Sequence, residues 1–314
     1  MTSVDAVDQV IEAGAAPRSR RARKDRPAGT PKMVGARGGA MRAGGSVFRW
    51  IALVIATVLF LVPFWLLIRN ALGTDNDIGS TSFFPRHPQW HNFTDLFSAN
   101  SDLGFGRAMM NSAIIAVVQT TGSLLIAAMA GYGLARIPYR HAKLVFYPIV
   151  LTLMIPGAVT FVPSFVLMSA FNWLDTLKAL IVPGLFSGFA TFLFRQFFLN
   201  FPKELEEAAR VDGVSYWGAF WRIVAPNSLA FTSALAVIGF IGSWNAFLWP
   251  LVVAGNSPSS YTVQVAMSTF LTAQVQHYPQ LFMAALVSIL PLVLVFAFLQ
   301  RYLVRGVAET GVKG

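Results

Sequence analysis

Residues 50–68 read WIALVIATVLFLVPFWLLI, an apolar run without a charged side chain that is long enough to cross the hydrocarbon core of a bilayer. Backbone amides in hydrocarbon must be hydrogen-bonded internally, and this run is too long for a strand of a membrane barrel, so a helix is expected. Five more apolar runs follow, at residues 109–134, 144–171, 177–194, 229–253 and 281–303. The sequence therefore predicts an all-α integral membrane protein with six transmembrane helices.

The positions of the basic residues predict the orientation of these helices. Of the 314 residues, 55% are hydrophobic and 12% are charged, and the mean hydropathy is +0.58. With six spans both termini share one side, and only four of the 24 basic residues lie on the other: Arg69, Arg86, Arg107 and Lys178. Cytoplasmic segments of membrane proteins carry an excess of Lys and Arg. We therefore expect a multi-pass protein of the inner or plasma membrane with cytoplasmic N- and C-termini, and we attribute the net charge of +10 to this bias and not to nucleic acid.

The first 46 residues differ from the rest of the chain. They are rich in Gly, Ala, Pro and Arg and show no apolar periodicity. We predict that residues 1–46 form a disordered basic cytoplasmic tail and that residues 47–314 form the membrane domain. The tail either marks the cytoplasmic side, which we favour, or binds anionic lipid headgroups.

The charged residues exclude several classes of function. None of the 14 acidic residues falls within a predicted span, and all four histidines fall in loops. Ion-coupled carriers and intramembrane hydrolases need ionisable side chains within the membrane. The chain has no cysteine and no G-x-x-x-x-G-K-[ST] phosphate-binding loop. We predict no catalytic residue and no metal site, and any ATP hydrolysis must come from a partner chain.

The longest predicted cytoplasmic loop, residues 201–226, reads FPKELEEAARVDGVSYWGAFWRIVAP. Pro202 favours a helix start, and Asp212-Gly213 favours a turn. A second helix is expected from near Ser215, with one apolar stripe and an end at Pro226; the stripe consists of Trp217, Phe220, Trp221 and Val224. Such a helix-turn-helix fits a groove on another protein, or it lies on the membrane surface as an interfacial helix.

The pattern E-A-A-x-x-D-G within this loop, residues 207–213, resembles the EAA loop of binding-protein-dependent ATP-binding-cassette importers. The resemblance extends over residues 47–314 to sugar permeases of the maltose-transporter type, on Trp90, Asn92, Phe93, the Tyr132–Arg136 helix end, Trp244-Asn245 and the tail from Gln300. It implies a type I importer permease fold with a cytoplasmic coupling helix-turn-helix. Ala246 departs from the family, where a polar residue often follows Trp-Asn.

The resemblance implies a permease that moves a di- or oligosaccharide by alternating access. Its expected partners are a second, non-identical permease subunit, a homodimer of ATPase subunits that holds ATP and Mg, an extracytoplasmic solute-binding protein and membrane lipid. No cofactor is expected in this chain. The residues expected to dock on the ATPase are Glu207, Ala208, Ala209, Asp212, Gly213, Trp217, Phe220 and Pro226.

A sugar pathway needs aromatic faces together with amide or hydroxyl groups at mid-membrane depth. The candidates are Gln119, Thr120, Ser123, Ser187, Thr191, Ser243, Trp244 and Asn245, although such side chains more often bond one helix to another. Basic residues occur in the spans only near their ends, which favours a neutral sugar over a phosphate ester. The alternatives are a permease for glycerol-phosphate or another polyol, and a self-contained channel.

Overall fold

The computed structural model describes residues 38–80, 82–98, 104–255, 257–271 and 278–310. The chain divides into two units, residues 1–58 and residues 59–314, and the described part of the first unit is helical. Most of the predicted tail lies outside the described residues. Helix α2, Gly38–Ala71, begins within that tail and continues into the second unit.

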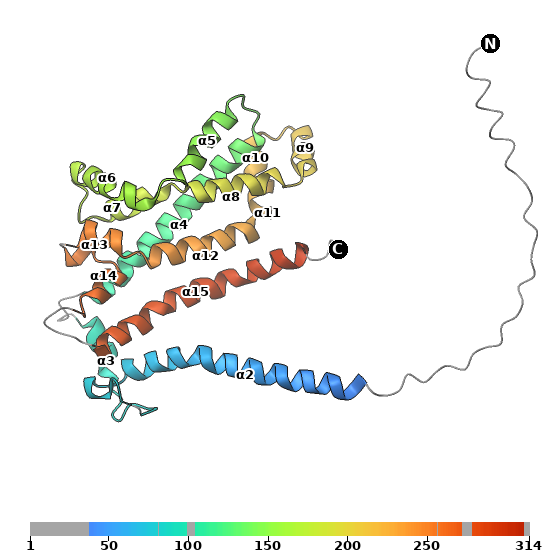
Figure 1. Ribbon diagram of the computed structural model, residues 1–314. Coiled ribbons are helices and arrows are strands. Elements are labelled where there is room, and N and C mark those ends of the chain that lie inside the picture. Colours follow the sequence, from blue (N-terminus) through green and yellow to red (C-terminus); the bar gives the residue numbers. More distant parts are fainter. Residues whose placement is uncertain (1–37, 81, 99–103, 256, 272–277, 311–314) are drawn as a thin grey trace, which may run out of the picture. The chain divides into compact units, whose positions relative to one another are not determined.

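The described residues form helices joined by turns and loops (Figure 1). After α2 the α-helices are α3 His91–Phe97, α4 Phe105–Arg136, α5 Ala142–Thr152, α6 Gly157–Ala170, α7 Leu177–Ile181, α8 Gly188–Leu199, α9 Lys203–Val211, α10 Tyr216–Ala219, α11 Ala225–Asn227, α12 Leu229–Trp244, α13 Leu248–Ala254, α14 Val263–Ser268 and α15 Tyr278–Thr310. Short 3-10 turns lie at Asp75–Asp77, Val182–Leu185 and Pro258–Ser260, and a π-helical turn lies at Phe220–Val224.

Within the described residues, four segments are long and apolar enough to cross a membrane: Phe48–Ala71, Phe105–Arg136, Leu177–Leu199 and Tyr278–Tyr302. Two bent helix pairs raise the number of candidate spans to six if each pair counts as one. The pairs are α5 with α6, bent by 96°, and Tyr216–Asn227 with α12, bent by 75°. The prediction of an all-helical membrane protein is confirmed, with four to six candidate spans.

Two of the predicted spans are not single helices in the structure. The run 144–171 is broken at residues 153–156, because the residue before a proline avoids the α-helical region and Pro156 itself is extended, with ψ 135°. The run 229–253 ends at Trp244. A continuous helix would need an N–H at Pro250, whereas the separate helix α13 places this proline in its first turn, where no N–H is required.

Helix α4 organises the second unit. It packs against both α8 and α12, and α12 packs in turn against α15 (Figure 1). At the crossing of α4 with α8, a Cβ added to Gly131 would lie 2.7 Å from Phe194 Cβ and 2.8 Å from the Arg195 amide nitrogen. Small residues at such crossings let two membrane helices approach closely. The helix packing of this unit therefore depends on glycine at position 131.

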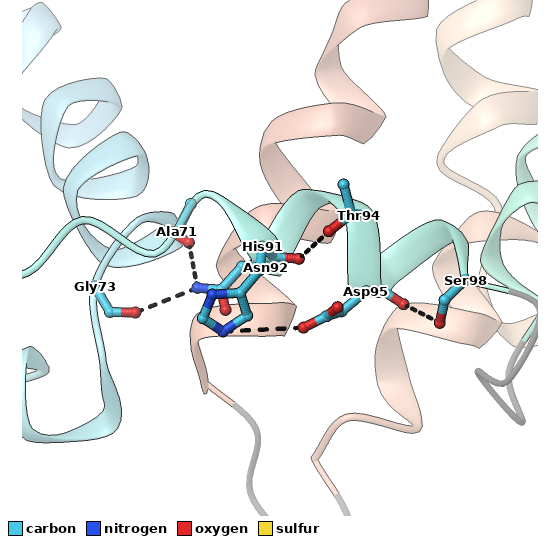
Figure 2. Close-up of polar contacts among 7 residues, drawn as sticks. All are labelled: Ala71, Gly73, His91, Asn92, Thr94, Asp95 and Ser98. Carbon is cyan, nitrogen blue, oxygen red and sulfur yellow. Dashed lines mark hydrogen bonds and ion pairs between the residues drawn. The ribbon is translucent and has the colours of Figure 1, made fainter.

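At the other end of α4, polar contacts hold α3 to the end of α2. The side-chain amide of Asn92 donates to the carbonyls of Ala71, at 2.9 Å, and Gly73, at 3.3 Å (Figure 2). His91 and Asp95 lie on the same helix with 3.9 Å between Nε2 and Oδ2. Because Asn92 donates hydrogen bonds to carbonyls at and just after the C-terminal end of α2, it has a structural role in joining α3 to α2.

Candidate functional site

The loop 201–226 is a helix-turn-helix, as the sequence predicts. Pro202 directly precedes α9, and the Ser215 hydroxyl accepts a hydrogen bond from the Gly218 amide at 3.1 Å, which caps α10. Between the helices Gly213 has φ +79°, a conformation that side chains with a Cβ rarely adopt. The turn at residues 212–213 therefore requires glycine at its second position.

The second arm continues past the predicted end at Pro226. The π-helical turn Phe220–Val224 lets the Ala225 amide donate to the Phe220 carbonyl five residues back. Because of this shifted hydrogen-bond register, Pro226, which has no N–H, fits inside α11. The arm ends one turn later, where the Ser228 hydroxyl donates to the Val224 carbonyl at 2.8 Å. Pro226 is therefore exposed on a helix and does not end it.

The predicted apolar stripe of this arm is divided between two surroundings. Phe220 and Val224 are buried, and Phe220, only 1% exposed, packs against Tyr132 with 5.0 Å between ring centroids. Trp217 and Trp221 are instead 43% and 52% exposed. One half of the stripe thus fixes the arm to its own helices, and the other half remains available to a partner.

The tip of the loop presents the exposed apolar and acidic side chains. Val211 is 88% exposed, and Leu205, Glu207 and Asp212 are exposed as well. The Arg210 guanidinium carbon lies 4.6 Å from the ring centroid of Tyr216, so this cation packs across the turn onto the second arm. A surface with apolar side chains beside carboxylates fits a partially apolar, basic groove.

Beneath this tip, a buried ion pair joins α9 to the end of α4. Glu206 Oε1 lies 3.1 Å from Arg136 Nε, and the two side chains are only 8% and 7% exposed. The Tyr132 hydroxyl lies 2.9 Å from Glu206 Oε2 and 3.1 Å from the Tyr216 carbonyl, and Arg136 Nη2 donates to the Phe201 carbonyl. We call Tyr132, Arg136 and Glu206 the clasp. It connects both arms of the loop directly to a membrane-spanning helix.

Arg136 and Glu206 form an ion pair without a well-aligned hydrogen bond between Nε and Oε1. Arg136 Nε and Glu206 Oε1 are close, yet neither atom has an aligned hydrogen-bond partner. Buried charges are costly to leave unpaired, so each member of the pair requires the other. The clasp therefore fixes where the base of the loop sits on α4.

A separate cavity of about 230 Å³ lies between α4, the turn Val182–Leu185, α8 and α12. Its polar lining residues are Gln119, Thr120, Ser123 and Ser187. The Gln119 amide donates to the carbonyls of Leu180, at 3.1 Å, and Ile181, at 3.4 Å. Thr120 is 9% exposed, and its hydroxyl has no hydrogen-bond partner. The cavity therefore contains unused hydrogen-bonding capacity.

Comparison with known proteins identifies the family of this chain. Residues 123–309 match the family model of the binding-protein-dependent transport system inner membrane component. The chain belongs to this family. It is a multi-pass inner-membrane permease subunit of an ATP-binding-cassette importer, which works with a separate ATPase and a binding protein, so the sequence-based family and the prediction that it is not an enzyme are confirmed.

The permease aligns with nearly the whole length of two curated relatives. The sn-glycerol-3-phosphate transport system permease protein of Yersinia pestis is 32% identical over 275 residues, which is 86% of this chain and 98% of that protein. The arabinooligosaccharides transport system permease protein of Bacillus subtilis is 31% identical over 277 residues, or 86% of this chain and 97% of that protein.

A solved structure of a bacterial transporter involved in the import of the acidic polysaccharide alginate has the same fold. The TM-score is 0.70, with 18% identity, and the match covers 82% of this chain and 97% of that chain. The predicted importer permease fold is thereby confirmed.

The permease does not bring all of its predicted pathway residues together. Gln119, Thr120, Ser123 and Ser187 line the cavity, whereas Thr191, Ser243, Trp244 and Asn245 are not among its lining residues. Trp244 is buried, and its indole donates to the Ser288 carbonyl at 3.1 Å, while Thr191 donates to the Ser187 carbonyl within its own helix. The Asn245 side-chain oxygen accepts from Gln264 at 3.1 Å. The side chains of Thr191, Trp244 and Asn245 therefore make hydrogen bonds within the chain itself.

The predicted docking residues also separate into two groups. Glu207, Ala208, Asp212, Gly213, Trp217 and Pro226 are exposed. Ala209 and Phe220 are buried beneath them, so their side chains are not available to a partner in this structure. The sequence alone does not predict the clasp, because nothing in it pairs Glu206 with Arg136 and Tyr132. The sequence resemblance places Tyr132–Arg136 at a helix end, but it does not show that Arg136 is buried or that it pairs with Glu206.

Proposed function

We propose that this permease imports a neutral di- or oligosaccharide and that its ATPase docks on the loop 201–226. The observation that carries the proposal is the division of the loop into an exposed tip and a buried, clasped base. Val211, Trp217 and Trp221 offer apolar side chains to a partner, and Glu207 offers a carboxylate. A rigid element of this kind suits a groove on another protein better than a flexible loop, because little conformational entropy is lost on docking.

The orientation and the assembly follow from this proposal. The loop and both termini face the cytoplasm, where an ATPase homodimer supplies ATP and Mg. A second, non-identical permease subunit lies beside this chain, a solute-binding protein delivers the sugar from the other side, and lipid covers the remaining apolar surface. ATP-driven closure of the ATPase dimer is transmitted through the docked loop to α4, which alternates access to the pathway.

The lining of the cavity supports a neutral solute. The two relatives named above are transporters of sn-glycerol-3-phosphate and of arabinooligosaccharides. A phosphate group is usually held by Arg, Lys or backbone N–H groups. The described residues that line the cavity include no Lys or Arg, whereas they include hydroxyl and amide side chains and the ring of Phe189. Import of glycerol-phosphate or another polyol by the same machinery is the second candidate function.

Removal of the loop's carboxylate or of its turn glycine is expected to release the ATPase. The chain is co-expressed with its partner permease and ATPase, and the amount of ATPase that co-purifies is measured for Glu207→Ala and Gly213→Val. We expect at least a tenfold loss for each variant, since interface residues at a well-packed centre contribute about 2 kcal/mol or more. Gly213→Val acts through the positive φ, which a β-branched residue avoids.

His141→Ala, an exposed substitution outside the loop, is the control and is expected to retain the ATPase. Equal retention of the ATPase by all three variants would show that the loop is not the docking site. Solute flux through the isolated chain in liposomes, without ATP, would favour a self-contained channel instead.

A further inference from the structure

We infer that the cavity beside Thr120 is a subsite of this chain for one neutral, hydroxyl-bearing ring of the transported solute. The inference rests on the proposed function and assigns a part of the solute to particular residues. Its first support is Thr120, a lining residue of the cavity that is more than nine-tenths buried and whose buried hydroxyl has no hydrogen-bond partner. A buried hydroxyl without a partner costs free energy unless something fills the site.

The glycines of the cavity support the same assignment. A Cβ on Gly184 would lie 1.9 Å from Gln119 Nε2, so only glycine lets this amide extend across to the carbonyls of the α7 end. A Cβ on Gly239 would lie 3.3 Å from Thr120 Cγ2 and 3.6 Å from Thr120 Oγ1. Side chains at these two positions would occupy the space beside the polar groups. The packing thus keeps the cavity open next to Gln119 and Thr120.

The size and chemistry of the cavity indicate the class of ligand. Pockets for drug-sized ligands span roughly 300–1,000 Å³, and this cavity of about 230 Å³ is smaller. It suits a single ring and not a whole oligosaccharide. Hydroxyls at Thr120 and Ser123 offer donors and acceptors, and Phe189, which is 53% exposed, offers an aromatic face. An apolar ring face with a few placed polar groups is the environment that a sugar ring requires.

The subsite is tested by thiol labelling, which the chain favours because it contains no cysteine. Ser123→Cys places a thiol in the cavity, and Thr121→Cys places one on an exposed position of the same helix as a control. The complete importer is treated with a small maleimide in the presence of mixed neutral mono-, di- and trisaccharides, or of sn-glycerol 3-phosphate. We expect the neutral sugars to slow labelling at position 123 at least fivefold, with no effect of the phosphate ester and none at position 121.

A second variant pair tests the hydroxyl itself. Thr120→Val keeps the shape of the side chain and removes its hydrogen-bonding group, whereas Thr121→Val makes the same change at the exposed neighbour. In liposomes with the binding protein and ATP, uptake of the protecting sugar is expected to fall about five- to tenfold for Thr120→Val, as for one lost hydrogen bond. Thr121→Val is expected to transport normally.

Failure of the subsite and failure of the proposed function are distinguishable. In both pairs the ATPase is expected to co-purify normally, because no substituted residue lies in the loop 201–226. Labelling at position 123 that no sugar slows overturns the subsite, and protection by the phosphate ester alone overturns its neutral ligand class. Labelling of the isolated chain but not of the assembled importer also overturns it, because a partner subunit then fills the cavity.

Discussion

Replacement of Glu206 by glutamine is expected to release the loop 201–226 from the membrane helices and to abolish ATP-driven transport. The carboxylate lies 3.1 Å from Arg136 Nε in a site where both side chains are more than nine-tenths buried. Removal of one partner of a buried ion pair typically costs about 3–5 kcal/mol, because the other charge stays buried without compensation. If the ATPase docks on this loop as proposed, motion of the loop would then no longer be transmitted to α4.

Trypsin measures this release, because Lys203 and Arg210 lie on α9 and Arg210 packs against Tyr216 in the intact loop. Cleavage after these residues is expected to accelerate at least tenfold in Glu206→Gln, while ATPase activity no longer responds to the binding protein. Glu204→Gln is the matched control, since it makes the same change on an exposed residue of the same helix. Similar cleavage rates in the two variants would refute the clasp.

The double variant Arg136→Met with Glu206→Met separates loss of the charge pair from loss of packing. Buried ion pairs replaced together by apolar residues of similar volume are often neutral or stabilising. We therefore expect the double variant to resist trypsin better than Glu206→Gln. A double variant as protease-sensitive as Glu206→Gln would mean that the hydrogen bonds of Tyr132 and Arg136, and not compensation of charge, hold the loop.

The helices of the loop 201–226 were predictable because their signals are local. Pro202 and Ser215 lie at helix starts and Gly213 at the turn, where sequence rules place them. The end of the second arm was not predictable from Pro226, because the π-helical turn before it shifts the hydrogen-bond register. Such turns have no clear sequence signal.

The positions of the spans were predictable from apolar length, but their continuity was not. Hydropathy treats Pro156 and Pro250 as residues within apolar runs, whereas in the structure a helix ends before each of them. Pro148 and Pro163 lie inside helices, so a proline in the sequence does not by itself locate a break. The candidate site shows the same limit. Gln119, Thr120 and Ser187, which are polar residues of neighbouring spans, line one cavity. Trp244 instead donates a hydrogen bond to the Ser288 carbonyl of another helix. Which face of a span points to a cavity depends on packing between helices, and one sequence does not define that packing.

The largest effect on folding is expected at the crossing of α4 with α8. Gly131→Ala would place a methyl group 2.8 Å from the Arg195 amide nitrogen, a backbone atom that cannot rotate away. Overpacking of this kind typically costs about 1–3 kcal/mol, and α8 carries the residues that precede the loop 201–226. We expect a lower thermal midpoint and at least a tenfold loss of monodisperse protein in detergent for Gly131→Leu, with a smaller loss for Gly131→Ala.

Gly133 provides the matched control two residues further along α4. A Cβ at this position meets nothing within 4 Å, so Gly133→Ala adds a methyl group to the same helix without a clash. Alanine favours a helix over glycine by about 1 kcal/mol, and Gly133→Ala is expected to raise the thermal midpoint slightly or leave it unchanged. The two alanine variants differ in one contact only, that with Phe194 and Arg195. If both lower the midpoint equally, the close approach of α4 and α8 does not limit the stability of this permease.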